Sequence, residues 1–215
     1  MKHTCYIVLV LLVVSISFNS CNNKKENVFY GNINDVISGL PVADVDILIE
    51  MREVSSYGAV AAYETIGSTV SDSEGSFRFS CDAARAVNFR LSFSKQGYFT
   101  KTLIITPVDV IGEYQASTAM GMVSHLMFTI QNVAPFSNDD VLRYRLSGLA
   151  DGCDDCCDDA LHSFYGAADT LTICPIVAYN DITIEYFTFI NGVSSQFTQQ
   201  ITGEPGDTVK IVMRY

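Results

Sequence analysis

The chain has 215 residues, of which 48% are hydrophobic, and a formal net charge of -11 at pH 7. This apolar content is enough for a packed core and excludes wholesale disorder. The acidic balance excludes a nucleic-acid-binding protein, because phosphate recognition needs a basic stripe, and it disfavours electrostatic docking on anionic lipid. Val, Ile, Thr, Phe and Tyr are frequent in the body of the chain and suit strands. We therefore expect an all-β protein.

Residues 1–20 have the organisation of a signal peptide. A short basic start precedes an unbroken apolar run over residues 6–14, which is too short to span a bilayer. Ser20 and Cys21 follow, and they resemble the lipobox of bacterial lipoproteins in the looser form found in Bacteroidetes, with Phe18 in place of the usual Leu. This resemblance implies cleavage before Cys21 and acylation of its thiol, whereas the alternative is an ordinary secretory signal.

Several acyl chains would hold the protein permanently on a membrane. The expected location is therefore the outer membrane, on either its cell-surface or its periplasmic face. Residues 21–27 are polar and have no periodicity, so we interpret them as a tether between the lipid and the folded body.

Residues 28–107 alternate apolar and polar side chains in several short runs. The clearest runs are residues 44–51, 76–80 and 87–94. A period of two places one face of a strand in the core and the other in water. Turn signals rich in Gly, Pro and Asp separate the runs. Short strands at this spacing predict an antiparallel β-sandwich.

Three landmarks in this half resemble the carboxypeptidase-regulatory-like (transthyretin-like) domain. They are residues 31–45 with Gly39-Leu40-Pro41, the turn at residues 72–77, and residues 93–98. The resemblance covers about residues 28–107 and implies a Greek-key sandwich without catalysis. The residues alone predict that Asp72 accepts backbone N–H groups across its turn. Calcium at Asp72 and Glu74 is disfavoured, because two carboxylates are too few for its coordination shell.

A second set of strands follows a seam at residues 107–112. Its clearest element is a hairpin in which residues 181–190 lead into Asn191 and Gly192, and residues 193–201 return. Asn-Gly is the preferred pair for a two-residue type I′ turn. We therefore expect residues 108–215 to form a second antiparallel sandwich, for which no family resemblance is evident.

Residues 151–159 form an unusual connection within the second half. They contain five carboxylates, Asp151, Asp154, Asp155, Asp158 and Asp159, and three thiols, Cys153, Cys156 and Cys157. Exported proteins oxidise their thiols, and Cys174 makes this set of cysteines even. We expect two disulfides, with Cys174 bonded to Cys156 or Cys157. Cys81 is in phase with apolar inward residues of its strand, so we expect it to be a buried free thiol.

Three other interpretations of this segment stay open. Zinc on the four cysteines lacks a second matching ligand pair, and calcium on the carboxylates lacks the alternating register of an EF-hand loop. Redox catalysis at Cys153 and Cys156 needs a helix N-terminus, and the neighbouring Asp residues would raise the thiol pKa. We expect no cofactor, with calcium as the alternative. The acidic charge makes the segment a candidate contact surface for a basic partner.

The remaining sequence contains few residue patterns typical of catalytic sites. His125 lies in an apolar strand run, His162 follows the acidic segment, and serine-hydrolase, zinc-protease and phosphate-loop signatures are absent from the sequence. Thr170 and Thr208 each follow an Asp and resemble O-glycan acceptors of Bacteroidetes exports. We predict a non-catalytic binding or accessory module that faces a glycan, peptide or protein partner. The alternative is a structural, pilus-like subunit that assembles by strand addition.

Overall fold

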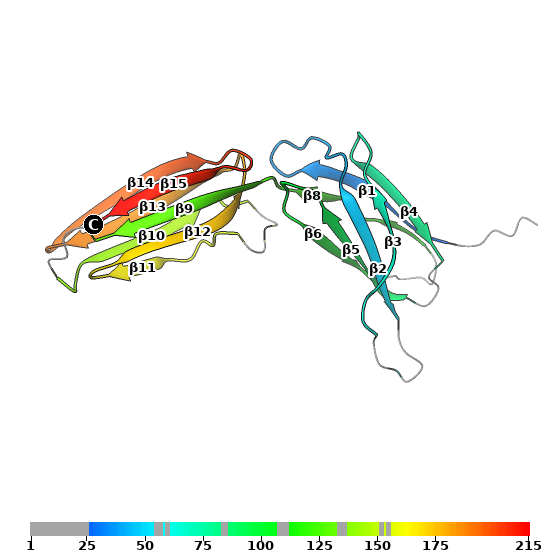
Figure 1. Ribbon diagram of the computed structural model, residues 1–215, viewed down its shortest axis with the longest axis horizontal. Coiled ribbons are helices and arrows are strands. Elements are labelled where there is room, and N and C mark those ends of the chain that lie inside the picture. Colours follow the sequence, from blue (N-terminus) through cyan, green and yellow to red (C-terminus); the bar gives the residue numbers. More distant parts are fainter. Residues whose placement is uncertain are drawn as a thin grey trace, which may run out of the picture.

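The computed structural model describes residues 26–53, 58, 61–82, 86–106, 112–132, 137–150, 153 and 156–215. The described residues form strands and turns without a helix, as Figure 1 shows, which confirms the predicted all-β class. Within these ranges there is accordingly no helix with the length and apolar character needed to cross a membrane. The predicted signal peptide and Cys21 lie outside the described residues.

The strands fall into two groups along the chain (Figure 1). The first group comprises β1 (Asn27–Asp35), β2 (Asp46–Glu53), β3 (Glu64–Val70), β4 (Ser76–Cys81), β5 (Ala86–Ser94), β6 (Lys101–Ile105), β7 (Glu113–Gln115) and β8 (Thr118–Met120). The second comprises β9 (Val123–Gln131), β10 (Val141–Ser147), β11 (His162–Tyr165), β12 (Asp169–Val177), β13 (Asp181–Ile190), β14 (Val193–Thr202) and β15 (Thr208–Arg214). Each group encloses its own hydrophobic core.

The first sandwich consists of two sheets. One has the order β4-β1-β7, with β8 also paired to β1, and the other has the order β3-β2-β5-β6. Strand β1 runs antiparallel to β4 but parallel to β7 and β8, which together act as one interrupted last strand. Alternate residues of the two sheets meet in the core, which includes Phe29, Ile33, Ile47, Ile49, Phe89, Leu91 and Phe93.

The interruption between β7 and β8 lies against Gly31. A Cβ atom at Gly31 would be 2.7 Å from the backbone nitrogen of Ser117. The Ala116 N–H donates to the Tyr30 carbonyl at 2.8 Å, and the Asn32 N–H donates to Ser117 Oγ at 3.1 Å. A glycine is therefore required for this close approach of two backbones.

The structure extends the first sandwich beyond the predicted boundary at residue 107. Strands β7 and β8 pair with β1, and Ala116 and Met120 belong to the first core, so this sandwich ends near residue 120 rather than at 107. The sequence pattern assigns these residues to the second half because strands of three residues show no period. Their partner strand is also distant, since the Gly112 N–H bonds to the Asn27 side chain across 85 positions.

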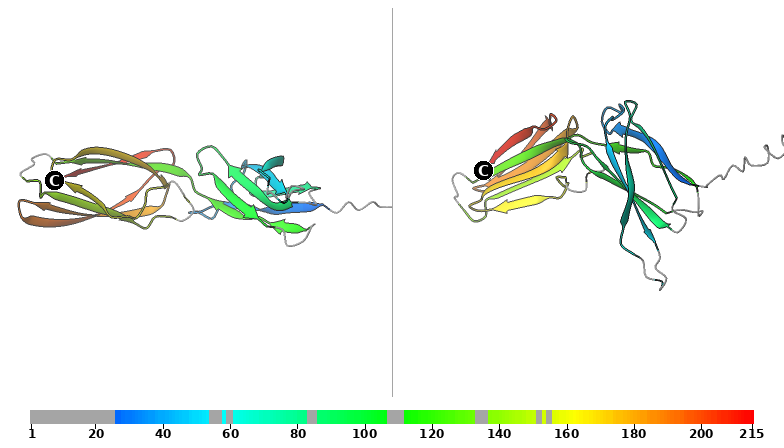
Figure 2. Two further views of the ribbon diagram at one scale, coloured as in Figure 1. Left: turned by 90° about the horizontal axis from the view of Figure 1, so that it is seen from below. Right: turned by 45° about the vertical axis from the view of Figure 1, so that its right-hand side comes forward.

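The second sandwich has the same strand order as the first. Its sheets run β12-β9-β15 and β11-β10-β13-β14. Numbered within each half, with β7 and β8 counted as one strand, both sandwiches have sheets 4-1-7 and 3-2-5-6. In both, the last strand runs parallel to the first, which adds one parallel pairing to the antiparallel sheets predicted from the sequence. Figure 2 shows the two sandwiches from two further directions.

Two predicted turns are confirmed. Asn191 and Gly192 have φ values of 51° and 78°, as a type I′ turn requires, and they join β13 to β14. In the first sandwich, Asp72 Oδ1 accepts the N–H groups of Glu74 at 3.0 Å and Ser76 at 2.7 Å. Both turns are therefore determined by local sequence.

Candidate functional site

The acidic cysteine segment lies between β10 and β11, and we call residues 148–161 the cysteine loop. Its three cysteines and Cys174 of β12 form two disulfides, Cys153–Cys156 and Cys157–Cys174, with Cα–Cα distances of 5.4 Å and 5.1 Å. The second bridge matches one of the two pairings expected for Cys174. The N–H of Cys157 also donates to the Pro175 carbonyl of β12 at 3.0 Å. Cys157 thus fastens the loop to the opposite sheet of the sandwich.

A carboxylate and a histidine fix the other end of the cysteine loop. Asp158 Oδ1 lies 2.8 Å from His162 Nε2 and accepts the Ala160 N–H at 3.1 Å. The hydrogen bond with His162, followed by that from Ala160, lowers the pKa of Asp158 below its ordinary value. The His162 ring stacks on Tyr144 with a centroid distance of 4.8 Å, and Tyr144 stacks on Phe128 at 4.9 Å. These contacts connect the loop to the core.

An open cavity of about 570 Å³ lies beside the cysteine loop. It is lined by residues 145–150 from the end of β10, by Cys153, Cys156 and Cys157, and by Asp158 and Asp159. Both carboxylates are exposed. Arg145, the basic residue of the lining, is paired with Glu185 at 2.5 Å, so its charge is already offset. Asp158 and Asp159 therefore dominate the charge of the lining.

The structure does not bring the five predicted carboxylates together within its described part. Asp151, Asp154 and Asp155 lie outside the described residues, as does Gly152. Among the described residues there is no group of three His, Cys, Asp or Glu side chains arranged to hold a metal ion. Calcium binding at the loop thus stays a prediction.

The two predicted glycan acceptors lie on different sheet edges. Thr170 is half-buried in β12, opposite Ile130 of β9. Thr208 is exposed at the first position of β15. Modification at either threonine stays a prediction, and exposure favours Thr208.

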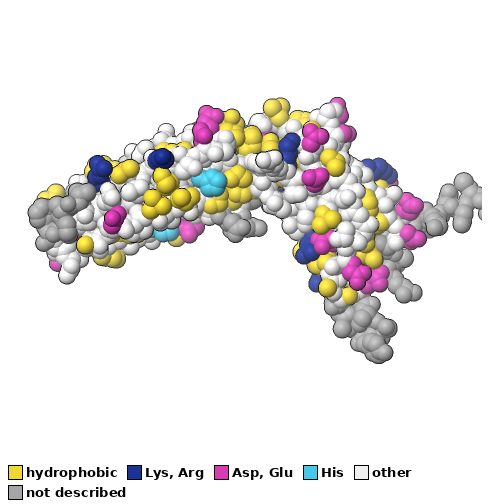
Figure 3. All heavy atoms as spheres, viewed as in Figure 1, with side chains coloured by type: hydrophobic (Ala, Val, Ile, Leu, Met, Phe, Trp, Pro, Cys, Tyr) yellow, Lys and Arg dark blue, Asp and Glu magenta, His cyan; other side chains and the backbone are white. Residues whose placement is uncertain are grey.

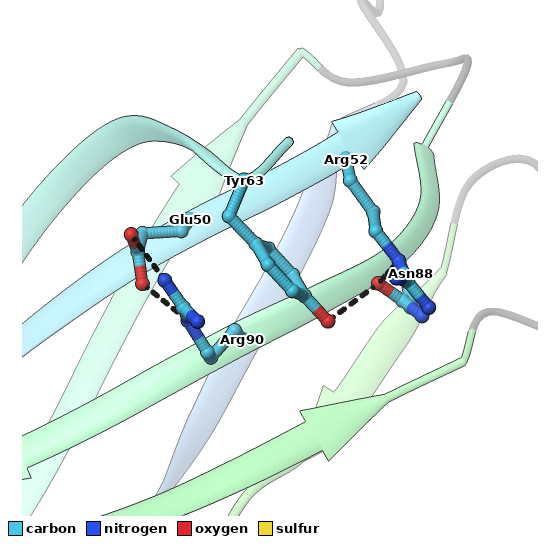
Figure 4. A network of polar contacts seen from close by, with 5 residues as sticks. All are labelled: Glu50, Arg52, Tyr63, Asn88 and Arg90. Carbon is cyan, nitrogen blue, oxygen red and sulfur yellow. Dashed lines mark hydrogen bonds and ion pairs between the residues drawn. The ribbon is translucent and has the colours of Figure 1, made fainter. Parts of the chain in front are cut away.

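A polar network on the first sandwich was not predicted from the sequence (Figure 4). Glu50 and Arg52 on β2 lie opposite Arg90 and Asn88 on β5. Arg90 donates two hydrogen bonds to the Glu50 carboxylate, at 2.6 Å and 2.8 Å. Its guanidinium lies 4.2 Å from the centre of the Tyr63 ring, and that of Arg52 lies 5.2 Å from it. The aromatic ring therefore separates two cations.

Buried Asn88 completes this network. Its Oδ1 accepts hydrogen bonds from Arg52 Nε at 2.7 Å and from the Tyr63 hydroxyl at 2.8 Å. The hydrogen bonds from Arg90 lower the pKa of Glu50, against the opposing effect of burial. The sequence shows polar residues two positions apart within two alternating runs, namely Glu50 and Arg52 in one and Asn88 and Arg90 in the other. Only the pairing of β2 with β5 shows that they meet.

An apolar surface on the second sandwich was also not predicted. Leu171 and Ile173 on β12 and Val212 on β15 are exposed by 61%, 54% and 54%, and both strands flank β9. Figure 3 shows hydrophobic side chains on the surface of this sandwich. Contiguous exposed apolar side chains on a folded domain are typical of protein contact surfaces.

No family model matches the chain, and no curated protein matches it. Among solved structures, the Bacillus anthracis TIE protein is 12% identical with a TM-score of 0.37; the match covers 88% of this chain and 34% of the TIE protein. The chain thus spans about a third of the length of that protein.

Two further solved structures show the same level of likeness. The shaft pilin SpaA from Lactobacillus rhamnosus GG is 10% identical with a TM-score of 0.34, over 88% of this chain and 97% of the pilin. The 3-chlorocatechol 1,2-dioxygenase from Rhodococcus opacus 1CP is 16% identical with a TM-score of 0.34, over 46% of this chain and 60% of the enzyme. Likenesses at these scores assign neither a family nor a function.

Proposed function

We propose that this protein is a non-catalytic binding module of the cell envelope, held on the outer membrane by lipid at Cys21, and that the cysteine loop is its contact site. The apolar run that ends at Ser20 and Cys21 supports the lipid anchor. The three landmarks of the first half support a carboxypeptidase-regulatory-like identity for that sandwich. Domains of this family act as accessory modules, which agrees with the proposed role.

The observation that supports the contact site is the cavity of about 570 Å³ beside a loop fastened by two disulfides. The bridges and the Asp158–His162 contact hold Cys153, Cys156, Cys157 and Asp158 in place before any partner arrives, which reduces the entropy lost on binding. The hydrogen bonds with His162 and Ala160, which lower the pKa of Asp158, favour its ionised carboxylate. An ordered, negatively charged cavity is complementary to a basic segment of a protein partner.

Charge neutralisation at the loop tests the proposed contact. A short oligolysine peptide serves as the probe, and its binding is measured by titration calorimetry at low and high salt. In the Asp158→Asn/Asp159→Asn variant, we expect the dissociation constant to rise by about tenfold or more. Binding by the wild-type protein should weaken with salt, because exposed charges are screened.

A matched control removes two negative charges elsewhere. Asp46→Asn/Glu64→Gln changes exposed residues of the first sandwich and should bind oligolysine like the wild type. Asp159→Asn alone keeps the Asp158–His162 contact, so weakened binding in this variant excludes loosening of the loop as the cause. Equal affinity of the loop variants and the control would refute the cysteine loop as the contact site.

The lipid anchor has a separate test. Cys21→Ser should move the protein from the membrane to the soluble fraction and block lipoprotein processing. Unchanged membrane partitioning with ordinary signal cleavage would contradict the anchor and would leave the cysteine-loop proposal intact.

The alternative function is a structural subunit that assembles by strand addition. One observation favours it, the long uncharged edge strand β14 of the second sandwich. Strand addition uses the free backbone groups of such an edge.

A further inference from the structure

Strand β14 is an unprotected sheet edge. It is ten residues long, pairs with β13 alone among the strands that the structure describes, and is exposed at every position except Ile201. Its sequence, Val-Ser-Ser-Gln-Phe-Thr-Gln-Gln-Ile-Thr, contains neither a charged residue nor a proline. Free edges with these properties template the addition of another strand.

The other edge strands of both sandwiches have protective features. Each edge of more than four residues contains at least one charge: Glu64 in β3, Arg78 in β4, Lys101 in β6, Asp169 in β12, and Lys210 and Arg214 in β15. Strands β7, β8 and β11 are only three or four residues long. Charges and short length are the devices by which proteins prevent edge pairing. Among the described strands, β14 is the long edge that lacks them.

The hairpin turn determines which backbone groups of β14 are free. Ile190 and Val193 flank the two-residue turn and form a hydrogen-bonded pair, and such pairs alternate along an antiparallel ladder. Every second residue from Val193 therefore bonds to β13. The residues between them direct their N–H and C=O groups to the open side: Ser194, Gln196, Thr198 and Gln200.

The side chains of β14 are arranged symmetrically about Phe197. Val193 and Ile201 lie four positions to either side, and the positions between them hold only Ser, Thr and Gln. Val193 is 66% exposed and Phe197 is 44% exposed. An antiparallel copy of this strand centred on Phe197 would therefore place apolar residues opposite apolar residues and polar residues opposite polar ones.

We propose that β14 pairs antiparallel with β14 of a second copy of this chain, about a twofold axis at Phe197. Phe197 then lies opposite its own copy, and Gln196 lies opposite Thr198 of the second copy. Phe197 already stacks on Tyr186 at a centroid distance of 4.7 Å, so pairing extends the stack to four rings. Each sheet gains four strands, and the free edge is covered.

The symmetric pattern about Phe197 favours a second copy of this chain as the partner, and the charge of the contact surface permits it. At a formal net charge of -11, two copies repel unless their contact surface is free of charge. Strand β14 meets this condition along its whole length, and the nearest acidic residue in the middle of β13, Glu185, is neutralised by Arg145 at 2.5 Å. This inference does not depend on the cysteine loop. It rests on the alternative function, strand addition, and specifies its partner and register.

Charge pairs across the interface test this register. Sedimentation equilibrium of the purified chain should show a reversible dimer. Gln196→Lys/Thr198→Lys places like charges opposite each other and should raise the dimer dissociation constant by about tenfold or more. Gln196→Glu/Thr198→Lys places opposite charges together and should dimerise like the wild type. The double-lysine variant also lowers the net negative charge, so overall repulsion cannot explain a weaker dimer.

A cross-link provides a second measurement. Phe197→Cys should give a disulfide-linked dimer under oxidising conditions, whereas Ser195→Cys, which lies opposite Gln199 of the second copy, should give less. A protein that stays monomeric at all concentrations overturns the proposal. If both charge variants dissociate the dimer, the register is wrong. Such a result fits a pairing whose twofold axis lies at Thr198, because that pairing places residue 198 opposite its own copy and gives like charges there in both variants. Failure of the register tests alone leaves strand addition by β14 in another register intact, and none of these outcomes affects the cysteine-loop contact.

Discussion

At the scale of single residues, the members of the polar network on the first sandwich serve as one another's hydrogen-bond and charge partners. Glu50 and Arg90 form a two-bond ion pair directly across β2 and β5, and Tyr63 stacks on the same guanidinium. Because each of these groups is held by a neighbour, the network stabilises the pairing of two central strands. It contributes rigidity to the scaffold rather than a reactive group.

The Glu50 carboxylate makes the stability of the protein depend on pH. Its pKa is lowered in the folded state, so its contribution is present above the unfolded pKa and is lost as pH falls through the folded pKa. We expect Glu50→Gln to lower the free energy of unfolding at pH 7, and the difference from the wild type to shrink below about pH 4. Urea unfolding at several pH values measures this. A difference that stays constant from pH 7 to pH 3 would contradict it, and Glu64→Gln is the control.

Cys81 is predicted to react slowly in the folded protein. It is the free cysteine of the described residues, as expected. The sequence pattern predicts a buried thiol, whereas the structure shows Cys81 half-buried. Burial first, and then the charges of Asp82 and Glu26, raise its pKa to about 11. Because the thiolate is the reactive form, alkylation at pH 8 should be slow until the protein is unfolded. After alkylation of the unfolded but unreduced protein, mass spectrometry should find one labelled cysteine in the chain from residue 26 onward, Cys81. Labels on the cysteines of the loop would refute the bridges.

At the scale of elements, the disulfides have unequal expected effects. Cys157–Cys174 closes a loop with a sequence separation of 17, whereas Cys153–Cys156 spans only three positions. Removing the longer bridge with Cys157→Ser/Cys174→Ser should lower the free energy of unfolding by about 3 kcal/mol, because the unfolded chain gains loop entropy. Cys153→Ser/Cys156→Ser should cost less. Chemical denaturation of the two variants measures both effects, and equal losses would contradict the loop-entropy explanation.

At the scale of the whole molecule, the two sandwiches have separate cores and the same strand order. The first core closes only when β7 and β8 cover β1, which requires residues up to Met120. We therefore expect the fragment of residues 26–121 to fold as a separate unit and the fragment of residues 26–107 to fold poorly.

Circular dichroism and thermal melting distinguish the two fragments. The longer one should show a β-type spectrum and a cooperative transition, and the shorter one a lower melting temperature or none. If both fragments melt alike, β7 and β8 are dispensable for the first core. If neither folds while the full chain does, the two sandwiches depend on each other for stability.

The sequence by itself determined the local structure of this protein. Alternation with a period of two predicted the long strands, and the Asn191-Gly192 and Asp72 turns formed as expected because their hydrogen bonds and φ values involve only neighbouring residues. The even set of cysteines and their spacing limited the disulfides to a few pairings, and the structure contains one of those expected.

The tertiary structure alone decided which strands are neighbours. The parallel pairing of β1 with β7 and β8 and the network around Tyr63 depend on contacts between residues far apart in the chain, and no local period encodes these. The exposed edge at β14 follows from the same choice, because a strand is an edge only relative to the sheet that it joins. Side-chain alternation specifies which face of a strand is buried. Backbone hydrogen bonds are alike for every sequence and therefore do not specify which strand is its neighbour. The packing of the whole core selects that neighbour.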